Sequence, residues 1–518
     1  MWSESGAIRK DKGGKLNVAL VYPGTYHVGM SNLGFHQMYR VLNAHPLILC
    51  ERFFTDAPRS VESGRPLSDF HVVAFSVSYE LDAVQAVRML CANGMDPHAE
   101  RRTTGPLVMA GGAAVTMNPE PLAPACDICF AGDGEVIVQP LYEAFSKSSS
   151  REEFLERMLQ TGGVYLPSRT RPVIEGGTLE AFEGPQVMRA VTETLDDPAR
   201  TSVVTRDTAF GDMFLVETAR GCPFSCSFCG ARQIYSPYRC AGVDTVARIL
   251  DEASRHRSKV GLVSTSLNTH PQAERLFEEI AARGLKLAPP SLRSGILTKG
   301  LLGALEKSGV KGVTLAPETG SETLREALGK RIPDATILED IRALVASGVR
   351  DIKLYFMVGL PGEGPRELDA TVDFVKRVRQ VFIQVSRGNR RIGTVSVSIG
   401  TFVPKPGTPL ERSPMITVDD ARARIRRIEQ GLKRESNVRV THEGPKWSYL
   451  QAVVARGDRR VHDLLVRLAG SDEQGWTAAL KRWPVNPDYF ALRPRDEDEV
   501  LPWSFISGPP RGGACRGT

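Results

Sequence analysis

The chain has 518 residues, of which 42% are hydrophobic, and its formal net charge is +6 at neutral pH. This length suggests about three domains, and the slight charge excess argues neither for nor against a nucleic-acid partner. No apolar run reaches membrane-spanning length and the first residues lack a signal-peptide pattern, so we expect a cytoplasmic protein that makes no membrane contact. Three of the nine cysteines are clustered, which suits metal ligation in a reducing compartment better than a disulfide framework.

Residues 16–145 follow a flexible polar arm over residues 1–15 and alternate apolar runs with helical patterns. The runs predict strands at 16–23, 71–78, 107–110 and 127–131. Helical spacing covers 31–43, the stretch from Asp82, and the stretch after Glu135. Strands that alternate with helices predict a doubly wound, flavodoxin-like or Rossmann-like parallel sheet, with ligands at the carboxyl ends of its strands.

A linker-like SKSSS sequence opens residues 146–212, which we interpret as a segment that wraps between domains and includes a short strand at 164–167. Cys126 and Cys129 form a C-x-x-C pattern at the start of a predicted strand. A redox pair normally opens a helix, so we interpret these two as core or loop thiols.

From residue 213 the alternation of strands and helices is regular. Strands are predicted at 213–218, 260–265, 285–288, 313–316, 352–357 and 395–402, and helices at 243–254, 271–283, 299–308, 321–328, 334–346 and 365–381. Six such units over residues 213–435 predict a partial (β/α)6 TIM-type barrel with its chemistry at the carboxyl ends of the strands. A charged helix at 417–435 ends this core. We expect residues 436–506 to form a helical C-terminal extension that closes the barrel mouth, and residues 507–518 to form a disordered tail.

Cys222, Cys226 and Cys229 follow the first barrel strand with the spacing C-x3-C-x2-C. Three thiolates on one short loop hold three irons of a cubane cluster and leave the fourth iron open. An open position makes a metal site catalytic. The alternative is a structural zinc knuckle completed by Cys240 or by a distant histidine, although zinc sites usually pair cysteines as two separate C-x2-C units.

This motif, with the aromatic Phe228 before its third cysteine, resembles the radical S-adenosylmethionine (SAM) superfamily. Five other stretches are similar to a bacterial group of cobalamin-domain radical SAM proteins with unassigned substrates: 214–221, 290–293, 315–321, 353–361 and 402–409. The resemblance covers residues 16–505. It implies a [4Fe-4S] cluster that binds SAM and reductively cleaves it to methionine and a 5′-deoxyadenosyl radical.

The resemblance also implies that SAM contacts come from the cysteine loop and the strand ends. The candidates are Phe228, Ser264, Ser266, Ser291, Arg293, Glu318, Lys353 and Tyr355. Arginine suits the SAM carboxylate because its planar fork pairs with a carboxylate through two hydrogen bonds. Thr319 and Ser321 are alternatively the caps of the helix that follows them.

Residues 16–145 resemble the cobalamin-binding domain that precedes many radical SAM cores. Ser76, Ser78, Gly111 and Gly112 lie where that fold lets the nucleotide tail of the cofactor pass, and glycine permits close backbone approach. The first loop departs from the D-x-H-x-x-G pattern because its aspartate is missing and its glycine is shifted, so His27 reads as a surface histidine. Cobalamin therefore binds without a histidine ligand or not at all, and the domain is then kept for packing or recognition.

The functional hypothesis is SAM cleavage followed by cobalamin-dependent methyl transfer to an unreactive carbon of an unknown substrate. The alternatives are a cobalamin-independent modification or rearrangement of a small molecule, an RNA or a protein, and a non-catalytic metal-binding protein. A reducing partner such as a flavodoxin or ferredoxin is implied. Residues 456–460 (RGDRR) face either an anionic substrate or the solvent.

Overall fold

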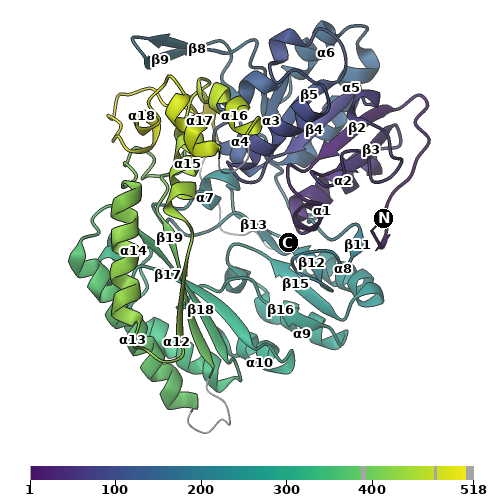
Figure 1. Ribbon diagram of the computed structural model, residues 1–518. Helices are drawn as coiled ribbons and strands as arrows, with labels where there is room; N and C mark the ends of the chain where they lie inside the picture. The colour runs from purple at the N-terminus through teal and green to yellow at the C-terminus, as the bar shows by residue number, and fades with distance from the viewer. Residues whose placement is uncertain (1, 387–392, 472–474, 509–518) are drawn as a thin grey trace.

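Two parallel α/β units stand one above the other in the computed structural model, which describes residues 2–386, 393–471 and 475–508 (Figure 1). The N-terminal unit, drawn in purple and blue, lies above the teal and green barrel. The yellow C-terminal helices return to the side of the N-terminal unit. Part of the predicted disordered tail, from residue 509 onward, lies outside the described residues.

The N-terminal unit is built on a six-stranded sheet. Its order is β3 (Ile48–Phe53), β2 (Leu16–Val21), β4 (Val72–Ser76), β5 (Leu107–Gly111), β6 (Ile128–Phe130) and β7 (Val164–Tyr165). The first five strands are parallel and β7 is antiparallel to β6. This is the doubly wound order of flavodoxin-like folds, in which the strand order reverses between β2 and β4. The predicted fold class of this unit is therefore confirmed.

Helices flank this sheet and connect its strands. They are α1 (Tyr26–Gly29), α2 (Leu33–Ala44), α3 (Asp82–Ala92), α4 (Ala113–Met117), α5 (Val138–Lys147) and α6 (Arg151–Met158). Strand β3 was not predicted, because Glu51 and Arg52 interrupt its apolar run. Both are buried and paired, Glu51 with Arg65 and Arg52 with Glu62.

The barrel consists of two parallel sheets. One contains β12 (Phe214–Glu217), β15 (Lys259–Val263) and β16 (Lys286–Ala288), and the other β17 (Gly312–Glu318), β18 (Asp351–Val358), β19 (Thr394–Thr401) and β20 (Val438–His442). A parallel bridge between Leu292 and Leu315 joins the two. All six predicted strands are present. Strand β20 lies where a helical extension was expected, and only Val438 and Val440 of this strand pack against the core.

Seven helices follow the barrel strands: α8 (Val243–His256), α9 (Ala273–Ala282), α10 (Lys299–Lys307), α11 (Glu322–Ala327), α12 (Asp334–Ala346), α13 (Pro365–Ser386) and α14 (Val418–Leu432). The apolar faces of six of them pack on the strands in one continuous core, whereas Leu324 of α11 packs in a separate cluster with Leu360 and Phe402. Ser321 caps α11 by accepting a hydrogen bond from the Leu324 amide, so the alternative role considered for this serine is realised.

The segment between the units is fixed to both of them. The hairpin β8 (Arg171–Glu175) and β9 (Thr178–Glu183) precedes β10 (Val187–Met188), which pairs with β21 (Ile506–Ser507). The arm predicted to be flexible is docked instead. Its β1 (Glu4–Ser5) pairs with β11 (Val204–Thr205), because Glu4 forms an ion pair with the buried Arg52.

The C-terminal extension contains α15 (Pro445–Arg456), α16 (Val461–Ala469), α17 (Trp476–Arg482) and α18 (Asp488–Ala491). We expected this extension to close the barrel mouth, but α16 packs against α3 of the N-terminal unit. Leu464 and Leu468 share a core with Val84 and Leu90, and Arg88 donates hydrogen bonds to the carbonyl groups that end α16. Among the described residues, no helix combines the length and apolar character needed to cross a membrane.

Candidate active site

The cysteine motif lies on a loop of residues 222–229 at the carboxyl end of β12. The short strand β13 (Ala219–Arg220) leads into it, pairs with β14 (Arg239–Cys240), and is followed by Gly221. Gly221 has a φ of +89°, and a Cβ atom there would lie 2.6 Å from the Tyr235 carbonyl oxygen. Only glycine therefore allows the chain to turn at this point. Ser227 anchors the loop by donating from its amide and hydroxyl to the Leu328 carbonyl, at 2.9 and 3.1 Å.

Cys222, Cys226 and Cys229 are free, half-buried thiols. In the described part of the chain, no three or more His, Cys, Asp or Glu side chains converge on a position for one metal ion. A cubane cluster takes each thiolate on a different iron, which three separate thiols on one loop fit. Burial raises the pKa of the Cys229 thiol, and the neighbouring Cys226 and Cys222 raise it further.

Arg293 lies directly beside this loop. Its guanidinium group stacks 3.6 Å from the centre of the Phe224 ring, and its Nη1 lies 3.7 Å from Cys226 Sγ. The Arg293 charge therefore lies next to one thiol of the motif. Ser291, two residues earlier, is exposed to solvent. Arg293, on the segment after β16, therefore contacts the cysteine loop.

Glu318 ends β17 in a strained conformation. Its φ is +71°, in the left-handed region, and the register of β17 against β18 shifts between Leu315 and Glu318. Non-glycine residues in this region cost about 1–3 kcal/mol and cluster at functional sites. The Glu318 carboxylate accepts a hydrogen bond from Lys330 Nζ at 2.7 Å. The predictions did not include Lys330, and no local sequence pattern indicated it.

Three polar residues follow β15 and approach the cysteine loop. The Thr265 hydroxyl donates to the carbonyl of Gly221. Ser264 accepts from the amide of Ser266, whose own hydroxyl is buried without a hydrogen-bond partner in the described part of the chain. Buried polar groups are normally paired, so this hydroxyl is available for a ligand.

Three further residues were predicted to contact SAM. Phe228, on the cysteine loop itself, packs in an apolar cluster with Leu324, Leu328, Leu360 and Phe402. Lys353 and Tyr355 are the third and fifth residues of the eight-residue strand β18, below the strand end, and Lys353 Nζ lies 4.6 Å from the centre of the Tyr355 ring. Phe228 thus lies beside Cys229 on the loop, whereas Lys353 and Tyr355 lie farther down the barrel than the end of β18.

A cavity of about 510 Å³ lies between the two units. On the N-terminal side all four predicted cobalamin residues line it, namely Ser76, Ser78, Gly111 and Gly112. On the barrel side it is lined by Gly221, Ser264 and Thr265, next to the cysteine loop. The volume is within the range of cofactor sites. The position is the strand-order reversal of the upper sheet, where doubly wound folds bind ligands.

One turn in the wall of this cavity requires glycine. Gly112 has a φ of +109°, and a Cβ atom there would lie 2.5 Å from the Val77 carbonyl oxygen. Asn32 donates to the hydroxyl of Ser78 at 2.9 Å. None of the described lining residues is a histidine. His27 is half-exposed on α1 and pairs with Asp207 at 2.9 Å, which agrees with its interpretation as a surface histidine.

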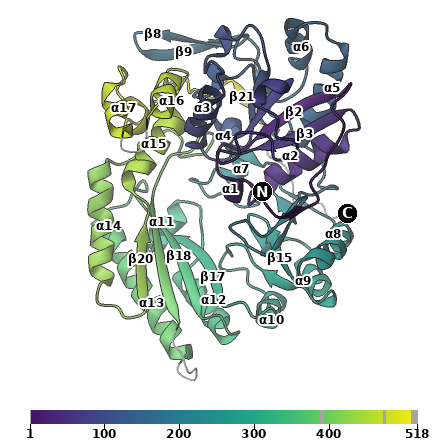
Figure 2. The same ribbon diagram turned by 45° about the vertical axis from the view of Figure 1, so that its right-hand side comes forward.

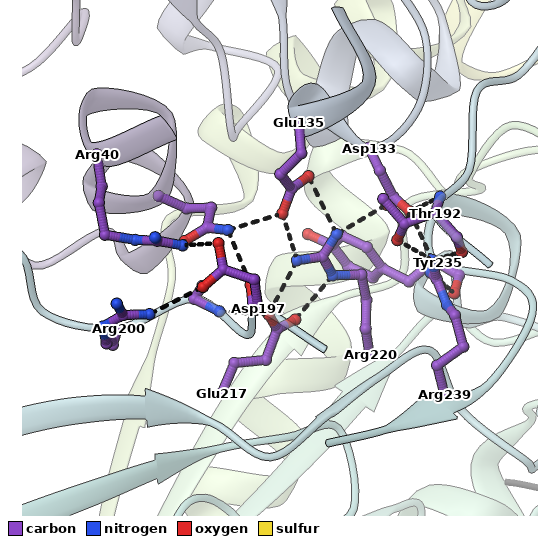
Figure 3. A network of polar contacts seen from close by, with 12 residues as sticks. Arg40, Asp133, Glu135, Thr192, Asp197, Arg200, Glu217, Arg220, Tyr235 and Arg239 are labelled. Carbon is purple, nitrogen blue, oxygen red and sulfur yellow. Dashed lines mark hydrogen bonds and ion pairs between the residues drawn. The ribbon is translucent and has the colours of Figure 1, made fainter. Parts of the chain in front are cut away.

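A network of charged residues forms part of the cavity wall and joins the units (Figure 3). Arg220 donates to Glu217 and Glu135 at 2.8 Å each and lies 3.2 Å from Asp133. Arg239 reaches the other oxygen of Asp133 at 2.6 Å. Burial opposes the charge on Arg220, but the hydrogen bonds and charges of Glu217 and Glu135 outweigh it and raise the pKa of Arg220. Burial also acts against the Asp133 carboxylate, yet Arg220 and Arg239 hold its pKa below the usual value.

The predictions missed this network. The sequence indicated it only through the run from Gly132 to Glu135, which follows a predicted strand. Polar side chains at that position lie at the carboxyl edge of the sheet, where doubly wound folds bind ligands.

Other sequence features have structural roles. Arg456 is fully buried and donates to the Ala491 carbonyl, and Arg459 pairs with the buried Glu120. Arg460 pairs with Asp458. Arg456 is therefore enclosed in the interior, and Arg459 and Arg460 are already paired with carboxylates. Cys126 and Cys129 are both buried in the core of the N-terminal unit.

The chain has a parallel partial barrel with a three-cysteine loop after its first strand. This combination is typical of enzymes that hold an iron–sulfur cluster on such a loop. Two family models match the chain. The model of the radical SAM superfamily covers residues 216–375, and that of the N-terminal part of radical SAM proteins covers residues 34–167. The chain belongs to the radical SAM superfamily and is a radical SAM enzyme.

Similar proteins match the chain over most of its length. An uncharacterized protein of Methanocaldococcus jannaschii is 27% identical over 453 residues, which are 87% of this chain and 90% of that protein. The radical SAM methyltransferase TsrM of Kitasatospora setae, solved with cobalamin and a [4Fe-4S] cluster, has a TM-score of 0.55 at 14% identity and covers 93% of this chain and 92% of its own. The cobalamin-dependent radical SAM enzyme OxsB has a TM-score of 0.52 at 16% identity, over 70% of this chain and 52% of that one. At these identities the likeness to the two solved structures shows the fold.

Proposed function

We propose that this enzyme cleaves SAM reductively and transfers a methyl group, with cobalamin, to an unreactive carbon of its substrate. One observation carries the proposal. A single cavity is lined on one side by Ser76, Ser78, Gly111 and Gly112 and on the other by Gly221, which immediately precedes the cysteine loop. A cofactor held by the N-terminal unit would thus face the barrel site directly. The solved structures of TsrM and OxsB, with cobalamin bound to the same fold, support this assignment.

Each residue of the site then has a defined task. Cys222, Cys226 and Cys229 would hold three irons of a [4Fe-4S] cluster, and Ser227 fixes their loop to α11. SAM would lie at the rim formed by Ser264, Ser266, Arg293 and Glu318. When bound, the cluster supplies the electron that cleaves SAM, and cobalamin supplies the methyl group. The protein positions these groups and excludes water, while the cofactors provide the reactivity.

The electron must come from outside the chain. Because the cysteine loop is half-buried beside the cavity, we propose a small reductant of the flavodoxin or ferredoxin class as the partner. Such reductants and intact iron–sulfur ligation both suit the reducing cytoplasm, which we propose as the location.

The test is anaerobic purification with hydroxocobalamin present, followed by metal analysis and an absorption spectrum. We expect roughly four irons per chain, as a [4Fe-4S] cluster contains, together with bound cobalt. Gly111→Leu provides the matched comparison, since a Cβ atom at Gly111 meets its nearest neighbour at 3.6 Å and the longer side chain extends into the cavity. This variant should retain iron and lose cobalt. Iron without cobalt in the wild-type protein would overturn the cobalamin assignment, and zinc alone would overturn the enzyme's whole metal assignment.

A further inference from the structure

The two halves of the barrel differ in what covers their inner faces. Figure 2 shows the two sheets side by side below the N-terminal unit. In the three-stranded half, Leu215 of β12 packs against Leu33 and Ala199. In the four-stranded half, alternate residues of β18 and β19 are half-exposed or exposed, although the residues between them are buried under the helices. This second inner face is open to a ligand.

The strand register arranges the inner-face side chains in rows, because residues paired in parallel strands point to the same side of a sheet. One row runs across four strands and contains Thr314, Lys353, Ser396 and Arg439. The next row toward the strand ends contains Tyr355, Ser398 and Thr441. Residues between the rows, such as Leu354 and Val397, belong to the buried core. The inner face therefore carries hydroxyl groups, one tyrosine and two cations.

The two cations have no carboxylate partner. Neither Lys353 nor Arg439 forms an ion pair with any described residue, although 37 ion pairs connect other charged side chains. The Cα atoms of Lys353 and Arg439 lie two strands apart, about 10 Å, so both long side chains reach one anion between them. A carboxylate on the same face, Asp351, lies at the start of β18 and accepts from the Thr394 amide at 3.2 Å.

Above these rows the face is open. A Cβ atom added to Gly400, which pairs with Met357 in register, would meet no atom within 4 Å. Tyr355 is 38% exposed, and it lies along β18 between Lys353 and the position that pairs with Gly400. The path from Arg439 through Tyr355 to Gly400 leads toward the strand ends, where the cysteine loop lies.

We infer that this inner face binds the substrate, and that the substrate is a small organic anion whose carboxylate or phosphate group is held by Lys353 and Arg439. Arginine binds either group through a planar fork, and lysine adds a point charge. Tyr355 would support the body of the substrate below the rim. The inference rests on the proposed function, since it names the substrate class of the same barrel. It reassigns Lys353 and Tyr355, which the sequence analysis connected with SAM.

The experiment measures the binding of three fluorinated probes to the reconstituted full-length protein, from the broadening of their ¹⁹F NMR lines as protein is added. The probes are 4-fluorobenzoate, 4-fluorophenyl phosphate and the neutral 4-fluorobenzamide. At least one anionic probe should bind ten-fold or more tightly than the amide, and the better one identifies the group. Lys353→Gln and Arg439→Gln should each weaken that binding at least five-fold. Lys307→Gln serves as the control, because Lys307 is an exposed cation in the last turn of α10, and it should leave probe binding unchanged.

Saturating SAM should leave the anionic probe bound. If SAM displaces it, or if both variants bind it as the wild-type protein does, the inference is overturned. The proposed function is tested separately by formation of 5′-deoxyadenosine in the reduced wild-type protein. Absence of that product overturns the proposed function whatever the probes do, whereas SAM cleavage combined with unaltered probe binding in both variants overturns the inference alone.

Discussion

At the scale of single residues, burial decides which side chains are free to react. The three loop thiols are half-buried, whereas Cys126 and Cys129 are buried in the core of the N-terminal unit. Reactive and metal-binding cysteines lie in partly exposed, electropositive surroundings, which Arg293 provides at Cys226. The same sulfur chemistry therefore gives a candidate cluster at one position and packing at another.

Replacement of any loop cysteine should abolish SAM cleavage. In Cys222→Ala, Cys226→Ala or Cys229→Ala one iron of the cluster would lose its thiolate, so we expect at least a hundred-fold less 5′-deoxyadenosine and a loss of bound iron. Cys91→Ala is the control, because Cys91 is a free and exposed thiol distant from the loop. Full turnover in any one of the three loop variants would refute the cluster assignment.

His36 should make the protein sensitive to acid. It is buried on α2, with Nε2 3.0 Å from the Met30 carbonyl oxygen, and burial lowers its pKa to about 4. In the unfolded chain the same histidine binds a proton near pH 6.5. Above that pH the side chain is neutral in both states, and the free energy of unfolding is not reduced. As the pH falls toward 4, protonation favours the unfolded chain and the free energy of unfolding decreases. The loss between pH 7 and 4.5 is about 2 kcal/mol.

The measurement compares urea midpoints at these two pH values. Wild-type protein should lose more stability on acidification than His36→Gln, by about that amount. His256→Gln alters an exposed histidine at the end of α8. This variant should lose as much stability between the two pH values as the wild-type protein does. Parallel pH profiles in wild type and His36→Gln would contradict the expectation.

At the scale of elements, the turn that follows β5 brings the backbone of Gly111 and Gly112 to the wall of the cavity. The turn from β5 to α4 requires a left-handed residue in contact with Val77, and Gly112 occupies it. Gly112→Ala should therefore lower the free energy of unfolding by roughly 1–3 kcal/mol, because it adds both backbone strain and a contact at 2.5 Å.

Gly111→Ala is the matched control in the same turn. Its φ is ordinary and its added Cβ atom would lie 3.6 Å from the Phe130 carbonyl oxygen, a normal contact. We expect a change below about 0.5 kcal/mol in its urea midpoint, as for most substitutions without such a mechanism. Equal midpoints for the two variants would show that the turn tolerates a side chain.

Elements with a regular pattern were predictable, and elements with buried charges were not. Helix α12 has the bounds expected from its apolar spacing, Asp334–Ala346. Strand β3 was not predicted because it contains two charged residues, Glu51 and Arg52. They are buried because each pairs with an opposite charge, which lies 14 and 10 residues away in the sequence. Strand β20 lies at the sheet edge, so only half of its pattern is apolar. The cysteine loop was visible because all three thiols lie within eight residues.

At the scale of the whole molecule, Arg220 and Arg239 both connect the two units. Arg220 reaches Glu135 across 85 residues of chain, a distance over which the sequence carries no visible pattern. Asp133 and Glu135, which pair with Arg220, lie on the N-terminal unit, whereas Arg220 itself lies two residues before Cys222. The relative position of cavity and loop thus depends on this network.

Arg220→Met should destabilise the protein by roughly 3–5 kcal/mol, because removal of one member of a buried ion pair leaves the other charges uncompensated. The free energy of unfolding is best measured in urea, since guanidinium screens charges. Arg275→Met is the control. Its pair with Asp244 is exposed and should contribute less than about 1 kcal/mol. Similar losses in the two variants would show that the network does not hold the units together.

The packing of α16 on α3 has a consequence for the order of synthesis. The apolar side of α3 is complete when residue 92 has been made, but its cover, Leu464 and Leu468, is made last. At ribosomal rates of about 5–20 residues per second, that surface waits some tens of seconds for its partner. The nascent chain should therefore be a client of ribosome-associated chaperones until its final helices emerge, and an early stop in translation should yield insoluble fragments.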